Sequence, residues 1–208
     1  MKLFTFVLLI LFISACANES TVDQPSTEEV ENNSSEQDKD TTADNTIEPT
    51  QPDEIIVLET PSSAYINDPE PNGPTNVRAT PNNGAIILEL PKNEDTYMFS
   101  ITAKSGRWFR ISDLSGIEKE IELPNNEGWV HGSLIEYGLR NDAATEVTLY
   151  ESADQESKAT LIKDFKNIKL VDITAEWMEV SCQDKENKVY QGWIKRDDLC
   201  GSPLTTCS

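Results

Sequence analysis

The chain has 208 residues and carries a formal net charge of −20 at neutral pH. This length allows one or two domains. The charge argues against a nucleic-acid-binding protein, because such a protein needs clustered Lys and Arg to neutralise phosphates. Much of the negative charge lies in residues 17–60, which contain 13 Asp and Glu against a single lysine, Lys39.

The first residues have the pattern of a bacterial lipoprotein signal. Lys2 precedes an apolar run over residues 3–13, which is too short to cross a bilayer as a helix but suits a signal-peptide core. The letters ISAC at residues 13–16 resemble the lipobox of bacterial lipoproteins. This resemblance implies that residues 1–15 are removed and that Cys16 is lipidated. An ordinary secretory signal and a retained membrane anchor are the alternatives.

Residues 16–60 are predicted to be a lipidated cysteine followed by an acidic tether. The segment is polar, interrupted by prolines and almost free of aromatic side chains. Because it cannot bury enough apolar surface to offset the entropy of ordering, we expect disorder. A coil of this length would span roughly 35–40 Å, enough to hold a domain clear of a membrane. Residue Ala17 is not an aspartate, and by resemblance to Gram-negative lipoprotein sorting this favours the outer membrane.

The rest of the chain, residues 61–208, has the pattern of an all-β protein. Short runs rich in Val, Ile, Thr and aromatic residues alternate with turns rich in Gly, Pro, Asn and Asp. The clearest runs are YMFSITA, RWFRI, GWVHGSLI, VTLYES, IKLVDITA, EWMEV and GWIKRDDL. No segment shows the apolar periodicity of a long amphipathic helix.

These runs occur twice in the same order, which indicates an internal repeat. Trp108 and Trp177 each begin a run and are followed three residues later by a β-branched residue. Trp129 and Trp193 each follow a glycine in a later run. Upstream, NVRATP of the first copy stands where TLYESA stands in the second. The repeat predicts two modules of similar architecture.

The first copy is similar to the bacterial SH3 (SH3b) family. It contains NVRATP, GRWFRI and GWVHGSLI, which match that family's opening segment, its tryptophan strand and its closing Gly-Trp segment. The second copy keeps EWMEV and GWI but opens with TLYES, so it is the more divergent one. The resemblance implies two tandem small SH3-like barrels, at residues 61–138 and 139–208, each partly open and five-stranded. A barrel of this size has a marginal core on its own.

His131 is the only histidine in the chain, and it lies in the closing segment of the first copy. The second copy has Lys195 at the equivalent position, so neither the fold nor a shared mechanism needs an imidazole. A catalytic histidine also needs a nucleophile, and no suitable cysteine is nearby in the sequence. We therefore expect a structural role for His131, and a chain that is not an enzyme and has no cofactor.

Three cysteines remain if Cys16 is lipidated, which predicts one disulfide and one free thiol. Cys200 and Cys207 enclose six residues and can close a local loop, while a bond between Cys182 and Cys207 is the alternative. Three cysteines without paired spacing and one distant histidine do not indicate a zinc site. The acidic stretches also lack the spacing and glycine of a calcium loop. No metal is expected.

Aromatic side chains of the two copies could line a groove for an extended ligand, although packing inside the modules is the competing interpretation. The candidate groove residues are Tyr97, Phe109, Trp129, His131, Tyr137, Tyr150 and Tyr190. Sequence alternation shows which residues share a face of a strand, but it does not show which face is inside.

The sequence thus predicts a membrane-anchored, non-enzymatic lipoprotein of the bacterial cell envelope. By the family resemblance, its SH3b-like modules bind cell-wall peptide or polymer, with peptidoglycan as the expected partner. A protein–protein adaptor that recruits another envelope protein is the alternative. The expected partners are the membrane, through the lipid anchor, and peptidoglycan or an envelope protein, but not nucleic acid.

Overall fold

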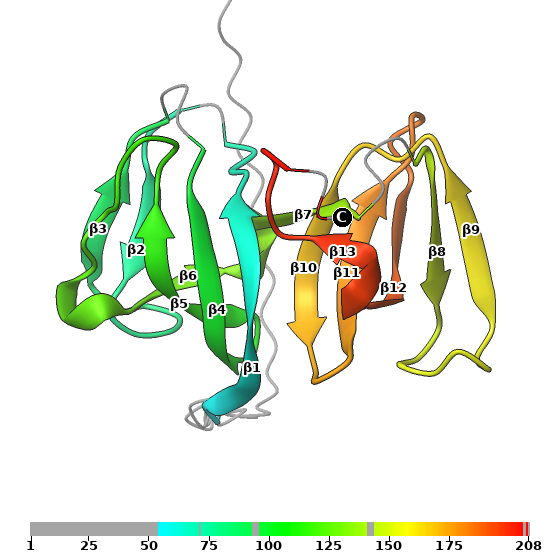
Figure 1. Ribbon diagram of the computed structural model, residues 1–208, viewed down its shortest axis with the longest axis horizontal. Helices are drawn as coiled ribbons and strands as arrows, with labels where there is room; N and C mark the ends of the chain where they lie inside the picture. Colours follow the sequence, from blue (N-terminus) through cyan, green and yellow to red (C-terminus); the bar gives the residue numbers. More distant parts are fainter. Residues whose placement is uncertain (1–53, 71, 93–95, 141–143, 206, 208) are drawn as a thin grey trace, which may run out of the picture. The chain divides into compact units, whose positions relative to one another are not determined.

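The computed structural model describes residues 54–70, 72–92, 96–140, 144–205 and 207 (Figure 1). This part of the chain is all β, as the sequence predicted, and its paired strands are antiparallel. Among these residues no helix is long and apolar enough to cross a membrane. The predicted signal peptide, the lipidated Cys16 and most of the predicted tether lie outside the described residues.

We refer to residues 56–139 as the N-terminal half and to residues 146–200 as the C-terminal half. The N-terminal half contains β1 (Ile56–Ile66), β2 (Thr75–Arg78), β3 (Ile86–Leu90), β4 (Met98–Ser105), β5 (Trp108–Ser115), β6 (Gly128–His131) and β7 (Ile135–Leu139), with 3₁₀ turns η1 (Pro124–Asn126) and η2 (Gly132–Leu134). The C-terminal half contains β8 (Glu146–Tyr150), β9 (Ala159–Lys163), β10 (Ile168–Ile173), β11 (Trp177–Gln183), β12 (Val189–Lys195), the 3₁₀ turn η3 (Arg196–Asp198) and β13 (Leu199–Cys200).

The strand order repeats when the hydrogen-bonded path is read inward from its two ends. The path runs β3-β2-β6-β5-β4-β1-β7-β10-β11-β12-β8-β9. From one end the order is β3, β2, β6, β5, β4, and from the other it is β9, β8, β12, β11, β10. In each half a 3₁₀ turn then leads into a short strand, β7 or β13, and these two strands pair with each other. The sequence repeat is therefore also a repeat of strand pairing.

The predicted tether extends too far, because β1 begins at Ile56 and not after residue 60. Ile56 pairs with Lys104 and Val57 pairs with Ala103 of β4. The run IIVLE is β-branched and apolar, which favours a strand. The prediction missed this run because the composition of residues 16–60 as a whole is dominated by the acidic residues that precede it.

The core follows the alternation of the strands. In β4, Phe99, Ile101 and Ala103 are buried while the residues between them are partly exposed. Successive side chains of a strand point to opposite faces, so each strand gives one face to the core. The same rule places Phe109 and Ile111 of β5 in the core.

The two halves are joined by pairing between β7 and β10, in which Glu136 lies opposite Lys169. The Glu136 carboxylate is buried and accepts hydrogen bonds from the Tyr65 hydroxyl at 3.2 Å and from Asn67 Nδ2 at 2.5 Å. It also forms an ion pair with Lys169 Nζ at 2.8 Å. These partners offset the cost of removing the carboxylate from water. Burial and the neighbouring carboxylate raise the pKa of Tyr65, so its hydroxyl remains a donor.

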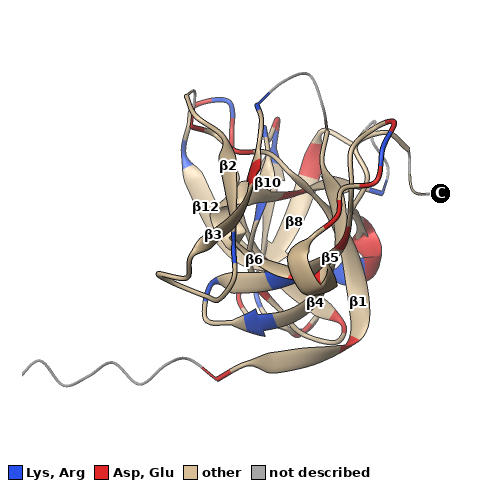
Figure 2. Cartoon of the chain, turned by 90° about the vertical axis from the view of Figure 1, so that its left-hand side faces the viewer, with Lys and Arg blue, Asp and Glu red and all other residues tan. Residues whose placement is uncertain are grey.

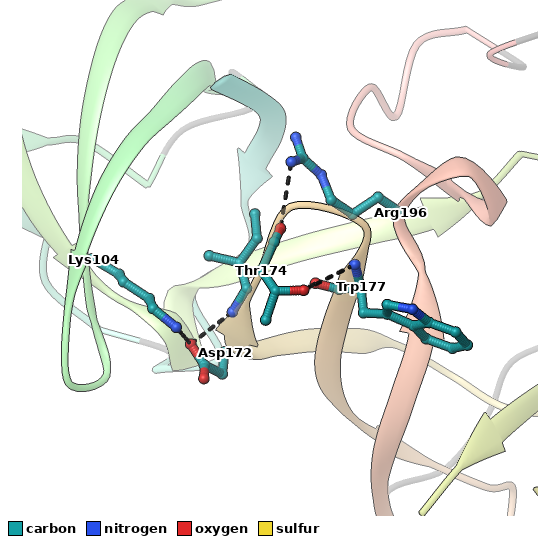
Figure 3. A network of polar contacts seen from close by, with 6 residues as sticks. Lys104, Asp172, Thr174, Trp177 and Arg196 are labelled. Carbon is teal, nitrogen blue, oxygen red and sulfur yellow. Dashed lines mark hydrogen bonds and ion pairs between the residues drawn. The ribbon is translucent and has the colours of Figure 1, made fainter. Parts of the chain in front are cut away.

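A second ion pair connects β4 of the N-terminal half to β10 of the C-terminal half (Figure 3). Lys104 Nζ lies 2.5 Å from Asp172 Oδ1, and the backbone N–H of Ile173 donates to the same oxygen at 2.7 Å. Lys104 has only 14% of its side chain exposed, so water screens the pair less than it would at the surface. The contact holds the two halves in one arrangement.

Arg196, the first residue of η3, makes a further connection between the halves. Its guanidinium donates to the carbonyl oxygen of Thr174 at 3.4 Å, in the turn between β10 and β11 (Figure 3). It also donates to the carbonyl oxygen of Ala175 in the same turn at 2.9 Å. The same group donates to the carbonyls of Thr60 at 3.2 Å and Pro61 at 3.1 Å in β1. One side chain thus bridges the backbones of both halves.

Candidate functional site

Trp108 is the centre of a ring-and-cation cluster on the N-terminal half. His131 of β6 lies opposite Trp108 on the neighbouring strand, and its ring contacts the Trp108 ring edge-on, with centroids 5.4 Å apart. The Arg78 guanidinium carbon lies 5.9 Å from the Trp108 ring centroid, within the range of a cation–π contact. Trp108 is only partly buried, so part of the ring remains open to a ligand.

The C-terminal half builds the same cluster with different side chains. Trp177 of β11 lies opposite Lys195 of β12, whose Nζ is 5.8 Å from the ring centroid. Tyr150 of β8 meets Trp177 edge-on, with centroids 5.5 Å apart. Lys195 therefore stands where His131 stands, and Tyr150 stands where Arg78 stands. The position predicted to be equivalent in the two copies is equivalent in space.

A groove of about 340 Å³ runs beside Trp108, and we call it the N-groove. The residues that define it include Asp68, Asn76, Arg78, Lys92, Trp108 and Leu134. Strand β2 supplies its floor because Thr75 and Val77 are buried, which turns Asn76 and Arg78 to the opposite face. Lys92 comes from the segment after β3, and Leu134 comes from η2.

The side-chain oxygen of Asn76 gives the N-groove an unused acceptor. Asn76 Oδ1 is buried and has no hydrogen-bond partner among the described residues. Buried polar atoms in folded proteins nearly always have a partner, because an unsatisfied one costs about 1–3 kcal/mol. The oxygen is closed to solvent, so an N–H group of a bound ligand would reach it only after the Asn76 side chain turns toward the N-groove.

Asp68 fixes one wall of the N-groove. Its carboxylate accepts from the Thr75 hydroxyl at 2.8 Å and from the backbone N–H of Glu70 at 2.9 Å, and Lys92 Nζ lies 3.2 Å away. Burial is the largest single effect and acts to raise the pKa of Asp68. The hydrogen bonds and the Lys92 charge together outweigh it and hold that pKa below its usual value. The Asp68 carboxylate is therefore ionised at neutral pH and paired with Lys92.

A second groove, of about 510 Å³, lies at the equivalent place in the C-terminal half, and we call it the C-groove. The residues that define it include Arg140, Glu146, Thr148, Tyr150, Ile194 and Asp198. Thr148 and Tyr150 occupy the positions on β8 that Asn76 and Arg78 occupy on β2, and Asp198 of η3 corresponds to Leu134 of η2. The two grooves share their backbone frame but differ in charge and in hydrogen-bonding groups.

Four of the predicted groove residues are buried, and none of them lines the N-groove or the C-groove. Phe109 and Tyr137 lie in the core, with 0% and 3% exposure. Tyr97 is 5% exposed and donates its hydroxyl to the Pro91 carbonyl at 2.8 Å. Trp129 is 4% exposed and packs on the face of β6 opposite to Val130. Packing, which was the competing interpretation, accounts for these four residues.

The other three predicted groove residues are partly exposed but lie apart. Tyr150 lines the C-groove. Tyr190 donates its hydroxyl to Asp184 Oδ2 at 3.1 Å and lies under Lys188, outside both grooves. His131 stands beside Trp108 and accepts a hydrogen bond from the backbone N–H of Ser133 at 3.3 Å. The prediction of one groove lined by all seven residues is therefore wrong.

The role of His131 is that of a cap and a packing partner. Its Nδ1 accepts the Ser133 N–H at the start of η2, and the Ser133 hydroxyl lies 2.8 Å from the same nitrogen. Partial burial, and secondarily the positive charge of Arg107, lower the pKa of His131. The imidazole is thus neutral at neutral pH, as the cap requires.

The sequence interpretation missed Asn76, Arg78 and Trp108 as groove residues. Their signal was present, because alternation in NVRATP puts Asn76 and Arg78 on one face and the repeat singles out Trp108. Asp68 and Lys92 come from segments between strands, where the sequence carries no comparable pattern.

The cysteines settle the choice left open by the sequence. Cys200 and Cys207 form a disulfide, as predicted. Cys182 is a buried free thiol, and burial raises its pKa to about 11, so it is unreactive at neutral pH. Within the described residues, no group of three or more His, Cys, Asp or Glu side chains could hold a metal ion.

Comparison with known proteins adds no family name. No model of a known protein family matches the chain. No curated protein matches it either. The functional argument therefore depends on the sequence motifs and the geometry of the two grooves.

Proposed function

We propose that this chain is a lipid-anchored protein of the bacterial envelope whose two halves are SH3b-like modules that bind an extended cell-wall peptide or polymer. The observation that carries the proposal is the recurrence of a groove at equivalent strands in both halves, lined by Trp108 in the N-groove and by Tyr150, which contacts Trp177, in the C-groove. A cell-wall polymer repeats the same chemical unit along its length, so it can occupy both grooves of one chain at once. Binding at two linked sites raises the overall affinity.

Two features support the interpretation of each half as a small SH3-like barrel. Five strands follow the same order in both halves, and each series is completed by a 3₁₀ turn and a short strand. The motifs NVRATP, GRWFRI and GWVHGSLI, on which the family resemblance depends, supply β2, β5 and β6 with the turn that follows.

The chemistry of the N-groove suits a peptide. Asn76 Oδ1 has no partner among the described residues and can accept from a backbone N–H once the side chain turns toward the groove, and the ion pair of Asp68 with Lys92 lies beside it. The partly open ring of Trp108 provides apolar contact between these polar groups. A few polar groups around an aromatic surface are typical of sites that recognise extended peptides.

We expect the purified chain to co-sediment with purified cell-wall sacculi, and we expect Asn76→Ala with Thr148→Ala to reduce the bound fraction at least about fivefold. The two residues hold equivalent positions in the two grooves, so the double variant weakens both sites together. A fivefold loss corresponds to about 1 kcal/mol, the typical contribution of one hydrogen bond.

The matched control is Asn83→Ala with Thr160→Ala. Asn83 lies in the exposed turn after β2 and Thr160 lies on β9, next to β8, and both are exposed outside the grooves. This variant should bind as the wild type does. Equal losses in both double variants, or no binding of the wild type to sacculi, would contradict the proposal. An envelope protein recovered with the wild type in place of sacculi would favour the adaptor alternative.

The anchor has its own test. We expect Cys16 to be the first residue of the mature protein and to carry acyl chains, because the letters ISAC place it at the cleavage point. Two or three chains would hold the protein stably in a membrane. Mass spectrometry of the mature N-terminus checks this, and a Cys16→Ser protein that still fractionates with membranes would contradict it.

A further inference from the structure

A pocket of about 630 Å³ lies between the two halves, and we call it the junction pocket. Its walls come from the middle of β1, the end of β7, the turn between β10 and β11, and η3. The charged residues among them are Arg140, Lys195, Arg196, Glu176 and Asp197. Tyr137 and Leu199 lie in the same pocket lining, and Lys195 and Arg196 belong to neither groove.

The three basic residues of the junction pocket have no carboxylate partner among the residues that the structure describes. Neither Arg140, Lys195 nor Arg196 forms an ion pair with an acidic side chain of the described residues. Acidic and basic residues are otherwise interspersed along the strands and turns of this chain (Figure 2). Three unpaired cations at one concave site are therefore notable in a chain with a net charge of −20.

The three basic side chains make different contacts. The Arg196 guanidinium donates to four backbone carbonyls, two in each half. Its N–H groups are therefore occupied, and its contribution to the pocket is its positive charge. Lys195 contacts the Trp177 ring, and a cation–π contact leaves the ammonium N–H groups able to donate. Arg140 makes no side-chain hydrogen bond within the described residues, so its fork of donors is open to a ligand.

The balance of charge selects the kind of anion. Three cations against Glu176 and Asp197 leave one net positive charge on the lining. A monoanion neutralises that charge, whereas a dianion such as HPO4²⁻ would leave an excess negative charge between two carboxylates. Arginine and lysine together are well suited to a carboxylate, which accepts several charge-assisted hydrogen bonds at once.

We propose that the junction pocket is a carboxylate-binding site, formed by Lys195 and Arg140 with the field of Arg196, and that it takes the free carboxylate end of a small peptide. The site exists only where the halves meet, since its lining comes from both. This inference does not require the two grooves to bind cell wall.

The probe is N-acetyl-glycyl-alanine, titrated into the ¹⁵N-labelled purified chain, with its C-terminal amide as the neutral counterpart. We expect millimolar binding of the acid, with shifts of the backbone N–H signals of Ser63 and Gly201, which line the pocket. The amide should bind at least about tenfold more weakly, because it lacks the charge that the lining selects. Inorganic phosphate, tested at about pH 8 where it is mostly a dianion, should compete less well than the acid.

Two substitutions that change the charge of the pocket in opposite directions distinguish an effect on binding from a structural disturbance. Lys195→Gln should weaken binding of the acid about fivefold or more, while Glu176→Gln should strengthen it about threefold, because it removes a competing negative charge. Lys158→Gln, an exposed lysine outside the pocket, should have no effect. Equal binding of acid and amide, tighter binding of phosphate, or the same change in Lys195→Gln and Glu176→Gln would overturn the proposal.

Discussion

Trp129→Ala should lower the free energy of unfolding by about 3 kcal/mol, the lower end of the cost of truncating a buried tryptophan. The Trp129 ring is 4% exposed, although it lies outside the main core cluster. On β6 it pairs with Arg78 of β2 and with Arg110 of β5, so the ring sits among the stems of neighbouring cross-strand side chains. Domains typically have 5–15 kcal/mol of stability, so this loss is large.

Urea unfolding of the purified chain measures the effect, with His131→Lys as the control on the same strand. Because Lys195 already occupies the equivalent place beside Trp177, this substitution should change stability by less than about 1 kcal/mol. A His131→Lys variant that loses as much as Trp129→Ala would show that the Ser133 cap and the Trp108 contact are essential. A Trp129→Ala variant with wild-type stability would contradict the burial of the ring.

The all-β class and the repeat could be predicted because both depend on local pattern. Alternation identifies strands, and matched tryptophans identify equivalent strands, without knowledge of the tertiary contacts. The loop of Cys200 and Cys207 is also local, and the structure confirms that disulfide. The exception is the start of β1, where the apolar residues Ile56, Val57 and Leu58 were averaged with an acidic segment.

The groove could not be predicted residue by residue, because alternation does not say which face is inside. Trp108 and Phe109 are neighbours on β5, so one must face the core and the other must face away. The sequence interpretation placed Phe109 in the groove, but Phe109 is fully buried and Trp108 lines the groove. The larger aromatic ring is the less buried one, and only tertiary packing decides this.

The contacts between the halves were also beyond the reach of the sequence. Lys104 meets Asp172, and Glu136 meets Lys169, across separations that no local pattern encodes. The repeat gives no indication of the junction between the halves, because residues at equivalent positions of the two copies make different contacts there. Gly132 begins η2 and Arg196 begins η3 at matching places, yet the first must be small and the second must be long.

Gly132→Ala should destabilise the chain by about 1–3 kcal/mol, as expected when a group is forced into a packed site. A Cβ at this position would lie 2.5 Å from the Leu170 carbonyl oxygen and 2.8 Å from Cε2 of Phe109. The Phe109 ring is fully buried and the Leu170 carbonyl belongs to the backbone of β10, so neither neighbour can move aside cheaply. The added methyl group would push η2 away from β10 and loosen the junction of the halves.

Gly138→Ala, six residues further along the chain, is the matched control. A Cβ there would meet its nearest atoms, in Cys200, at 3.8 Å, which is an ordinary van der Waals distance. Its midpoint of urea unfolding should stay near that of the wild type, because the site has room and alanine restricts the unfolded chain. Equal midpoints for the Gly132→Ala and Gly138→Ala variants would mean that η2 is not held tightly against β10. A lowered midpoint for Gly132→Ala alone would show that the close approach of the two halves at this glycine contributes to the stability of the whole folded part.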